Sequence, residues 1–134
     1  MTDKIILYSS KLGKTRKIAK YIAMELKADS FDLKKQTAID LSEHDCVIFG
    51  TGIRAGKPYG AIVKFLEDNK TQLQGKNTSL FISCKFCGTK GDEQLKKVSE
   101  QLGISNASYF AGKGEKNEEG FIKEIDDFIR KMSA

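Results

Sequence analysis

The sequence predicts an α/β fold in which helices cover both faces of a parallel sheet. Short apolar runs of strand length alternate along the chain with longer segments whose apolar residues recur at helical spacing. Glycines and other turn residues separate the two kinds of segment. Five such strands and four helices are typical of a doubly wound sheet, whose ligand binds beyond the carboxyl ends of the strands.

The first strand and helix enclose a loop suited to holding phosphate. Ile5–Tyr8 has the length and branching of a buried strand, and the helix after it has the apolar residues Ile18, Ala19, Ile22, Ala23 and Leu26. Between them, Ser9–Thr15 supplies hydroxyl groups and a glycine. The N–H groups at a helix start are unpaired and the helix dipole favours negative charge there. Ser10 and Thr15 would also be expected if they only cap the helix.

Two further strands come next. Ser30–Leu33 is short and flanked by lysines, as expected at a sheet edge. Asp45–Gly50 is a buried strand, followed by the Gly-rich loop Thr51–Pro58. A helix then begins soon after the only proline. Its apolar face consists of Ile62, Val63, Phe65 and Leu66.

The last part of the chain repeats the alternation. Thr78–Ser83 is predicted to be a buried strand ending in the loop Cys84–Gly91, and a helix follows with Asp92 and Glu93 at its start. Ser108–Ala111 is the last strand. The closing amphipathic helix has the apolar residues Phe121, Ile122, Ile125, Phe128, Ile129 and Met132. The loops after the first, third and fourth strands are therefore expected to converge on one crevice.

Composition narrows the class of protein. The chain has 134 residues, 40% hydrophobic and 31% charged, and no apolar run of membrane-spanning length. Its N-terminus leads directly into the first strand, so we expect a cytoplasmic protein with no membrane insertion and with reduced cysteines. The formal net charge of +5 favours acidic partners.

Two other phosphate-dependent classes fit the loops poorly. Gly13-Lys14-Thr15 matches the end of a Walker A loop, but Tyr8 stands where that motif needs its first glycine. A phosphorylated receiver domain needs carboxylates after the first strand and an acceptor aspartate after the third. This chain has Ser9-Ser10 and Gly50-Thr51 at those places.

The loops do resemble those of a known family. Tyr8–Thr15 is similar to the phosphate loop of flavodoxins, in which a tyrosine-ended strand leads to a hydroxyl, two residues, glycine, any residue and threonine. The similarity continues through Asp45–Gly50, Ile53–Gly56, Gly75-Lys76 and Phe110–Gly112. These most closely resemble the flavodoxin-like domain of menaquinone-dependent protoporphyrinogen dehydrogenases. The resemblance implies non-covalent FMN and a single flavodoxin-like domain over residues 1–134, with a five-stranded parallel sheet in the order 2-1-3-4-5.

The resemblance also assigns the cofactor-binding residues. The phosphate would be held by Ser10, Lys11, Leu12, Gly13, Lys14 and Thr15. One side of the isoalloxazine would be bordered by Thr51, Gly52, Ile53, Arg54, Ala55, Gly56 and Lys57, and the other by Cys84, Lys85, Phe86, Cys87 and Gly88. Phe86 and Tyr59 are the aromatic residues available to sandwich the ring.

Two features of these loops bear on redox behaviour. In flavodoxins a peptide of the second loop turns over so that its carbonyl accepts a hydrogen bond from reduced flavin N5. Ala55-Gly56 or Gly56-Lys57 would be that peptide, because glycine tolerates a positive φ. The loops also contain many basic residues, which would favour the reduced, anionic cofactor. These are Lys11, Lys14, Arg54, Lys57, Lys85 and Lys90.

The other reactive residue types indicate no catalytic or metal site. Cys84 and Cys87 form a C-x-x-C pair, but they follow a strand rather than beginning a helix in a thioredoxin-like unit. Cys46 is expected to be buried in its strand, so no four-thiolate metal site can form. His44, the only histidine, is expected on the surface beside Glu43 and Asp45, and we assign no catalytic base.

The resemblance implies electron transfer between a soluble donor and acceptor, with redox proteins as partners. A protoporphyrinogen dehydrogenase-like or other FMN-dependent oxidoreductase is the alternative. Those dehydrogenases have a longer segment before the last helix than Gly112–Asn117, which favours the carrier. A nucleic-acid or protein-binding module is a third class, because basic loops can follow a phosphate backbone. No nucleic acid is expected, since these loops converge on a crevice and lack a stripe of aromatic residues. The sequence does not indicate an oligomeric state.

Overall fold

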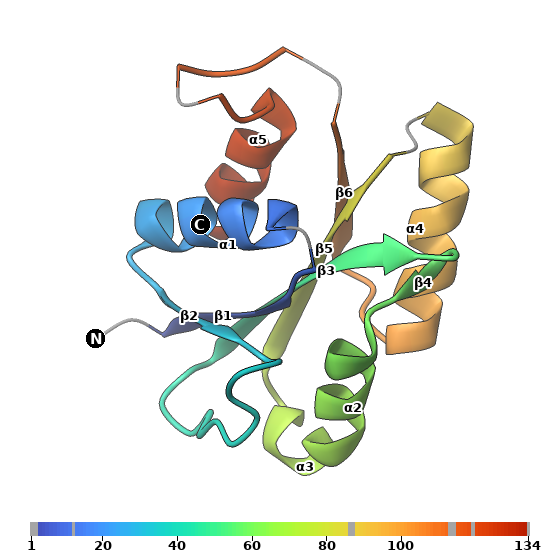
Figure 1. The fold of residues 1–134 in the computed structure, drawn as a ribbon. Helices are drawn as coiled ribbons and strands as arrows, with labels where there is room; N and C mark the ends of the chain where they lie inside the picture. Colours follow the sequence, from blue (N-terminus) through green and yellow to red (C-terminus); the bar gives the residue numbers. More distant parts are fainter. Residues whose placement is uncertain (1–2, 12, 86–87, 113–114, 119, 134) are drawn as a thin grey trace.

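The computed structural model describes residues 3–11, 13–85, 88–112, 115–118 and 120–133, and a twisted parallel sheet forms its centre (Figure 1). Its strands are β1 (Lys4–Ser9), β2 (Asp29–Asp32), β3 (Cys46–Arg54), β5 (Asn77–Cys84) and β6 (Ala107–Ala111). They lie in the order β2-β1-β3-β5-β6, and each neighbouring pair is parallel. This order is the 2-1-3-4-5 arrangement implied by the resemblance, so that prediction is confirmed.

Helices cover both faces of the sheet (Figure 1). One face carries α1 (Lys14–Leu26) and α5 (Lys123–Met132). The other carries α2 (Gly60–Asp68), the short α3 (Lys70–Leu73) and α4 (Gly88–Leu102). The flavodoxin-like fold class predicted from the sequence is therefore observed.

Alternation along the strands divides the core into two layers. On β1, Ile5 and Leu7 pack with the layer under α2 and α4, whereas Ile6 and Tyr8 pack with the layer under α1 and α5. Successive side chains of a strand point to opposite faces, and both faces of this sheet are covered, so β1 reads as a continuous apolar run. Because the strands are packed on both faces, their carboxyl ends are held in place, and the loops predicted to form the crevice begin there.

The third strand is longer than predicted. Thr51–Arg54 belongs to β3 rather than to a loop, and the chain then turns back as β4 (Lys57–Pro58). The two strands pair antiparallel, with Ile53 opposite Pro58 and Arg54 opposite Lys57. β4 is thus a sixth strand, added to the five that the resemblance implied. Ala55 and Gly56 connect them with φ angles of 53° and 77°, the positive values that a two-residue hairpin turn requires. The sequence missed this hairpin because Ala-Gly is a weaker turn signal than Asn-Gly or Asp-Gly.

The helix after β5 also begins earlier than predicted. It starts at Gly88 rather than near Asp92. Glycines at 88 and 91 disfavour helix by about 1 kcal/mol each, which is why the sequence placed the start later. Gly91 is buried in the structure, so packing outweighs that intrinsic preference.

Two predictions about burial were wrong. His44 is 9% exposed rather than a surface residue, and its Nδ1 is buried with no hydrogen-bond partner among the described residues. Its carbonyl accepts a 2.7 Å hydrogen bond from Lys76 Nζ. Cys46, at the beginning of β3, is half-buried rather than fully buried. Burial still raises the pKa of the Cys46 thiol, which lowers its reactivity.

Candidate functional site

A crevice of about 500 Å³ opens at the carboxyl ends of β1, β3 and β5. The segments after these three strands converge there, as the sequence predicted. Its volume lies within the range of about 300–1,000 Å³ typical of small-molecule and cofactor sites. The crevice is lined by Ser10, Lys11, Lys14, Thr15, Gly52, Ile53, Ala55, Gly56, Tyr59, Ser83, Cys84, Lys85 and Gln94.

The start of α1 forms one end of the crevice. Gly13 is the residue before the helix and has a φ of 88°, and its N–H donates a 3.1 Å hydrogen bond to Ser10 Oγ. Among the residues that the structure describes, no side chain caps the start of α1 by a hydrogen bond, and the first turn of the helix contains no acidic residue. The first turn of α1 therefore supplies no negative charge to compensate the positive end of the helix dipole. An anion seated here would be stabilised by that dipole and by the backbone N–H groups.

The hairpin of β3 and β4 forms a second wall. Its tip presents Ala55 and Gly56 to the crevice, and Tyr59 follows directly after β4. The N–H of Tyr59 donates a 3.0 Å hydrogen bond to Thr51 Oγ1, and the Thr51 hydroxyl donates to the carbonyl of Gly52 at 2.8 Å. Thr51 is itself fully buried. Its role is thus to fix the hairpin and the Tyr59 backbone rather than to face the crevice.

Two ammonium groups lie near the ring of Tyr59. Lys11 Nζ is 5.5 Å from the ring centroid and Lys34 Nζ is 5.8 Å from it, both within cation–π range. Lys34 Nζ also donates a 2.9 Å hydrogen bond to the carbonyl of Ser10. Lys34 follows β2, a segment that the sequence did not connect with the site. It adds a positive charge beside the start of α1.

The segment after β5 and the helix α4 form the third wall. Cys84 is 6% exposed at the end of β5, and Lys85 follows it at the surface. Gln94 Oε1, from α4, is buried and has no hydrogen-bond partner among the described residues. A bound ligand with an N–H or O–H group could satisfy that oxygen, because a buried acceptor left unpaired is costly.

Ten of the predicted residues line the crevice. They are Ser10, Lys11, Lys14, Thr15, Gly52, Ile53, Ala55, Gly56, Cys84 and Lys85. The structure places five others beside the crevice rather than on its lining, namely Gly13, Thr51, Arg54, Lys57 and Gly88. Leu12, Phe86 and Cys87 lie outside the described residues.

Ser83 and Gln94 on the lining were not predicted from the sequence, and Tyr59 was expected only as one of two aromatic residues available to sandwich the ring. Ser83 is the penultimate residue of β5, one position before the segment that was assigned. Gln94 lies in the second turn of α4, where no sequence signal distinguishes it from a solvated polar residue. Only the packing of α4 against the sheet brings it to the crevice.

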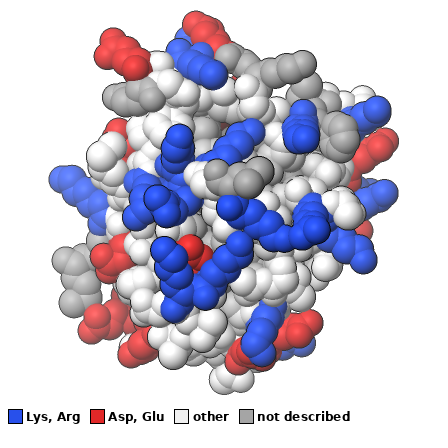
Figure 2. Space-filling model, in the orientation of Figure 1, with Lys and Arg blue, Asp and Glu red and all other residues white. Residues whose placement is uncertain are grey.

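The surface around the site is basic. Figure 2 shows Lys and Arg side chains gathered across the middle of one face, over the start of α1 and the end of β1, with Asp and Glu mainly toward the margin. Lys11, Lys14 and Lys85 on the lining are all exposed at the surface. Positive charge around a concave site raises the local concentration of anionic ligands and partners.

A family model for the flavodoxin domain matches residues 5–132, nearly the whole chain. The chain belongs to the flavodoxin domain family. It is 34% identical over 113 residues to an uncharacterized protein of Methanocaldococcus jannaschii, a match covering 82% of this chain and 74% of that protein. It is 30% identical over 100 residues to protoporphyrinogen IX dehydrogenase [quinone] of Escherichia coli strain K12. That match covers 71% of this chain but only 55% of the dehydrogenase, so the chain spans about half the length of that relative.

Solved structures agree on the flavodoxin fold. A flavodoxin, WrbA-like protein from Agrobacterium tumefaciens superposes with a TM-score of 0.71 at 16% identity, covering 99% of this chain and 94% of that one. A flavoprotein from Lactobacillus acidophilus, solved in complex with FMN, superposes with a TM-score of 0.62 at 18% identity, covering 81% and 93%. At these identities the superpositions establish the fold alone.

No described helix of this flavodoxin-domain protein is long and apolar enough to cross a membrane. Within the same residues, no group of three or more His, Cys, Asp or Glu side chains is arranged to hold a metal ion.

Proposed function

We propose that this flavodoxin-domain protein binds FMN in the crevice and carries electrons between a soluble donor and a soluble acceptor. The observation that carries the proposal is the continuity of the crevice, which joins the uncapped start of α1 to the wall formed by Tyr59 and the hairpin tip. One end suits a phosphate and the other suits a flat ring. The FMN complex of the Lactobacillus acidophilus neighbour supports the choice of ligand.

The residues present fit the two chemical parts of FMN. The N–H groups at the start of α1, the Ser10 and Thr15 hydroxyls, and Lys11 and Lys14 would surround the phosphate dianion. Tyr59 would pack against the isoalloxazine ring. Gly52 lets the Tyr59 side chain lie close against β3, because a Cβ at position 52 would be 2.6 Å from Tyr59 Oη. When bound, FMN supplies one-electron and hydride chemistry, while the protein supplies binding, orientation and electrostatics.

The hairpin tip would act on the reduced cofactor. A peptide carbonyl of Ala55-Gly56 or Gly56-Lys57 would accept a hydrogen bond from the ring when it is reduced, which the positive φ at both residues supports. The lysines around the crevice would stabilise the negative charge gained on reduction. They would also favour partners that dock through an acidic surface, and the rate of electron transfer should then fall as salt concentration rises.

A fluorescence titration tests the binding step. FMN is added to ligand-free protein and the quenching of its fluorescence is followed, with riboflavin and FAD as comparison ligands. We expect FMN to bind at least about 100-fold more tightly than riboflavin, because the missing phosphate removes several charge-assisted hydrogen bonds. Absence of quenching by FMN would contradict the proposal, and equal affinity for riboflavin would contradict the role of α1.

An FMN-dependent oxidoreductase is the second candidate function. The 30% identity to protoporphyrinogen IX dehydrogenase favours it, although the match covers 55% of that enzyme. The carrier is preferred because β6 ends at Ala111 and α5 begins at Lys123, so only a short connection is available to build a substrate surface. Turnover of protoporphyrinogen with a quinone by the FMN-loaded protein would favour the oxidoreductase. Reduction by a flavodoxin reductase followed by transfer to a second protein would favour the carrier.

A further inference from the structure

Two residues that the sequence predicted to border the cofactor, Arg54 and Lys57, do not line the crevice. They lie directly opposite each other on the hairpin of β3 and β4, and we call them the hairpin pair. The next pair along the hairpin faces inward, because Ile53 packs against the core and Pro58 is buried. Successive residues of a strand point to opposite faces, so the hairpin pair points outward, and both side chains are exposed. Their charges therefore call for a role other than lining the crevice.

The hairpin pair brings two positive charges together. Side chains directly opposite each other on antiparallel strands interact, and like charges in that position destabilise the pairing. The turn is also unfavourable, since Ala55 has a φ of 53°, which a residue with a Cβ seldom adopts. Residues that lower stability without contributing to packing are often retained for function.

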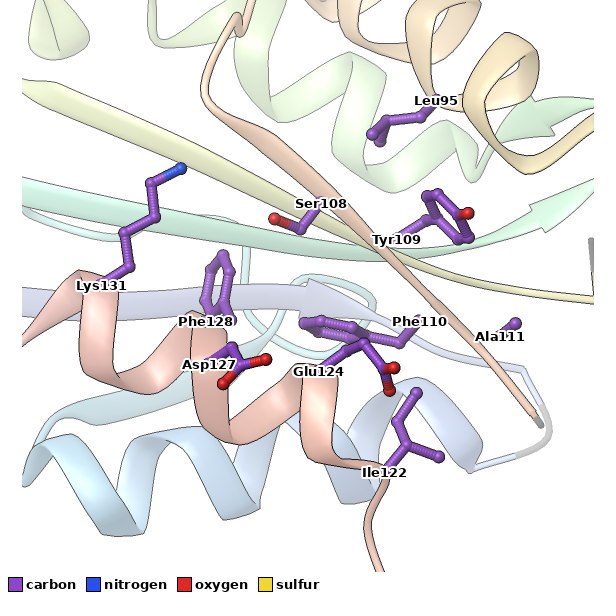
Figure 3. A pocket seen from close by; sticks show the side chains of 10 residues that line it. All are labelled: Leu95, Ser108, Tyr109, Phe110, Ala111, Ile122, Glu124, Asp127, Phe128 and Lys131. Carbon is purple, nitrogen blue, oxygen red and sulfur yellow. The ribbon is translucent and has the colours of Figure 1, made fainter. Parts of the chain in front are cut away.

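The described carboxylates leave the charge of the hairpin pair uncompensated. Within the described part of the chain, none of the ion pairs includes Arg54 or Lys57. The helix α2 follows the hairpin closely and has no acidic residue in its first turn. Glu124 and Asp127 belong to α5, which covers the other face of the sheet, and they flank a groove beside β6 (Figure 3). The two cations are thus available to carboxylates of another molecule.

The turn Ala55-Gly56 connects the hairpin pair to the crevice. It joins Arg54 to Lys57, and both of its residues line the crevice. Lys11 and Lys34 lie near the ring of Tyr59, which follows β4 directly. Positive charge therefore extends from the crevice to the outer face of the hairpin. A molecule bound to the hairpin pair would be separated from the crevice by this two-residue turn.

The form of the hairpin favours a protein as the bound molecule. Sites for small molecules are concave, whereas the hairpin pair is exposed on the outer face of two short strands. Nucleic acids are held by rows of cations along the phosphate backbone. The sequence on either side of the hairpin pair adds none, because residues 47–53 and 58–63 contain no charged side chain. Two adjacent cations match a small group of carboxylates on a protein surface.

We propose that the hairpin pair binds a group of carboxylates on an acidic electron-transfer protein, which makes the β3–β4 hairpin a docking element. The proposal rests on the proposed function, because the docked protein is a redox partner of the cofactor in the crevice. The planar guanidinium of Arg54 can bind a carboxylate through two parallel hydrogen bonds, and Lys57 adds a compact positive charge. Bound carboxylates also offset the repulsion between the two cations, so docking stabilises the hairpin.

Isothermal titration calorimetry of the ligand-free full chain tests docking without the cofactor. The probe is succinylated cytochrome c, whose lysines carry added carboxylates, and native cytochrome c is the basic comparison. At low salt we expect the succinylated form to bind and the native form not to bind. The double variant Arg54→Gln/Lys57→Gln should raise the dissociation constant at least about ten-fold. Failure of the succinylated form to bind the wild type, or equal affinity for this variant, would overturn the proposal.

The matched control for this titration is Lys20→Gln/Lys27→Gln. Both positions are exposed, one on α1 and one directly after it, and the net charge falls by the same amount as in the hairpin variant. The control should bind succinylated cytochrome c within about two-fold of the wild type, because these charges are not on the hairpin. A loss of affinity as large as that of the hairpin variant would assign the binding to net charge and overturn the proposal. Binding of a DNA duplex that is lost only in the hairpin variant would overturn it as well.

Electron transfer distinguishes failure of this proposal from failure of the proposed function. Fully reduced FMN holds two electrons and passes one to each of two ferric haems, which become ferrous. Succinylated cytochrome c should be reduced by the FMN-loaded protein at least about ten-fold more slowly when Arg54→Gln/Lys57→Gln replaces the wild type. If FMN binds and both proteins react equally fast, the docking proposal fails and the proposed function stands. If FMN does not bind, the proposed function fails and the calorimetric result is unaffected.

Charge reversal tests the repulsion within the hairpin pair. Lys57→Glu and Arg54→Glu each place opposite charges across the hairpin. In urea denaturation at low salt, each should raise the equilibrium constant for folding about two- to five-fold. The double variant Arg54→Glu/Lys57→Glu restores like charges and should be less stable than either single variant. A double variant more stable than both single variants would show that the two side chains do not repel each other, and would overturn the proposal.

Discussion

The ring of Tyr59 lies so close to Gly52 that a Cβ at position 52 would be 2.6 Å from the Tyr59 Oη and 2.8 Å from its Cζ. Real Cβ atoms do not approach other heavy atoms this closely, so a glycine is required on β3 for the tyrosine to occupy its position. The backbone of Tyr59 is held by the buried Thr51 hydroxyl one residue earlier on the same strand. Adjacent residues of β3 thus fix both ends of the aromatic wall of the crevice.

Gly52→Ala should displace Tyr59 and destabilise the protein. We expect the free energy of unfolding to fall by about 1–3 kcal/mol, the usual result of inserting a methyl group into a packed contact. FMN affinity should fall as well, because the displaced ring no longer borders the crevice. Urea denaturation and the fluorescence titration measure the two effects.

Gly60→Ala is the matched control for Gly52→Ala. Gly60 begins α2, and a Cβ there would meet nothing within 4 Å. This variant should be as stable as the wild type or slightly more so, because alanine favours helix over glycine. A Gly52→Ala variant with the stability and FMN affinity of Gly60→Ala would contradict the role assigned to the contact with Tyr59.

The part of the site that could be predicted from the sequence lies in segments with recognisable local patterns. Apolar periodicity located the strands, and the rule that ligands bind at the carboxyl ends of parallel strands located the crevice. Ser10 and Lys14 could be assigned because they occupy the loop between β1 and α1 itself. The same reasoning placed Cys84 and Lys85 on the lining through their position after β5.

The parts that the sequence missed depend on tertiary contacts. Lys34 reaches the carbonyl of Ser10 only because β2 pairs with β1, which brings the segment after β2 beside the phosphate loop. Gln94 is polar, and a polar residue on a helix is usually solvated, so the burial of its Oε1 could not be foreseen. His44 was placed at the surface because charged residues flank it, yet it is buried. Sequence neighbours do not determine which side chain turns inward.

Tyr21 and Asp126 form a contact whose stabilising effect should depend on pH. Tyr21 Oη donates a 2.6 Å hydrogen bond to Asp126 Oδ1, and Asn117 Nδ2 donates a 2.9 Å bond to Asp126 Oδ2. Both hydrogen bonds lower the pKa of Asp126 below its ordinary value, and the bond from Tyr21 has the larger effect. A lowered pKa in the folded state stabilises the protein above the unfolded-state pKa of about 4, and the effect is lost as pH falls through the folded-state pKa.

Tyr21→Phe should therefore destabilise the protein by about 1 kcal/mol at neutral pH and by less below pH of about 4. The ring remains and can still stack on Phe121, whose centroid is 4.2 Å away. Urea denaturation at both pH values measures the difference. Asp127→Asn removes an exposed ion pair with Arg130 on the same helix and should change stability little. A Tyr21→Phe effect of equal size at both pH values would exclude the ionised carboxylate as its cause.

Gly56→Ala should reveal what the hairpin tip does. Gly56 has a φ of 77°, and a Cβ there would meet nothing within 4 Å, so any effect arises from the backbone conformation alone. We expect a loss of about 1–2 kcal/mol of stability and a shift in the reduction potentials of the FMN-bound protein. Ala55→Asn is the comparison, because asparagine tolerates the φ of 53° better than alanine. Unchanged potentials in Gly56→Ala would rule out the tip as the group that responds to reduction.

Lys34→Gln should make the bound cofactor harder to reduce. Lys34 Nζ is 5.8 Å from the Tyr59 ring centroid and donates to the Ser10 carbonyl, so its charge lies at the junction of the proposed ring and phosphate sites. Removing one charge at this partly solvated position should cost about 1 kcal/mol of stabilisation of the reduced anion, roughly 40 mV for a one-electron step. High salt should reduce the shift, because the group is exposed to solvent. Lys64→Gln, which removes an exposed charge paired with Asp68 on α2, should leave the potential unchanged. If potentiometric titration finds equal potentials for the Lys34 and Lys64 variants at low salt, Lys34 does not act on the cofactor.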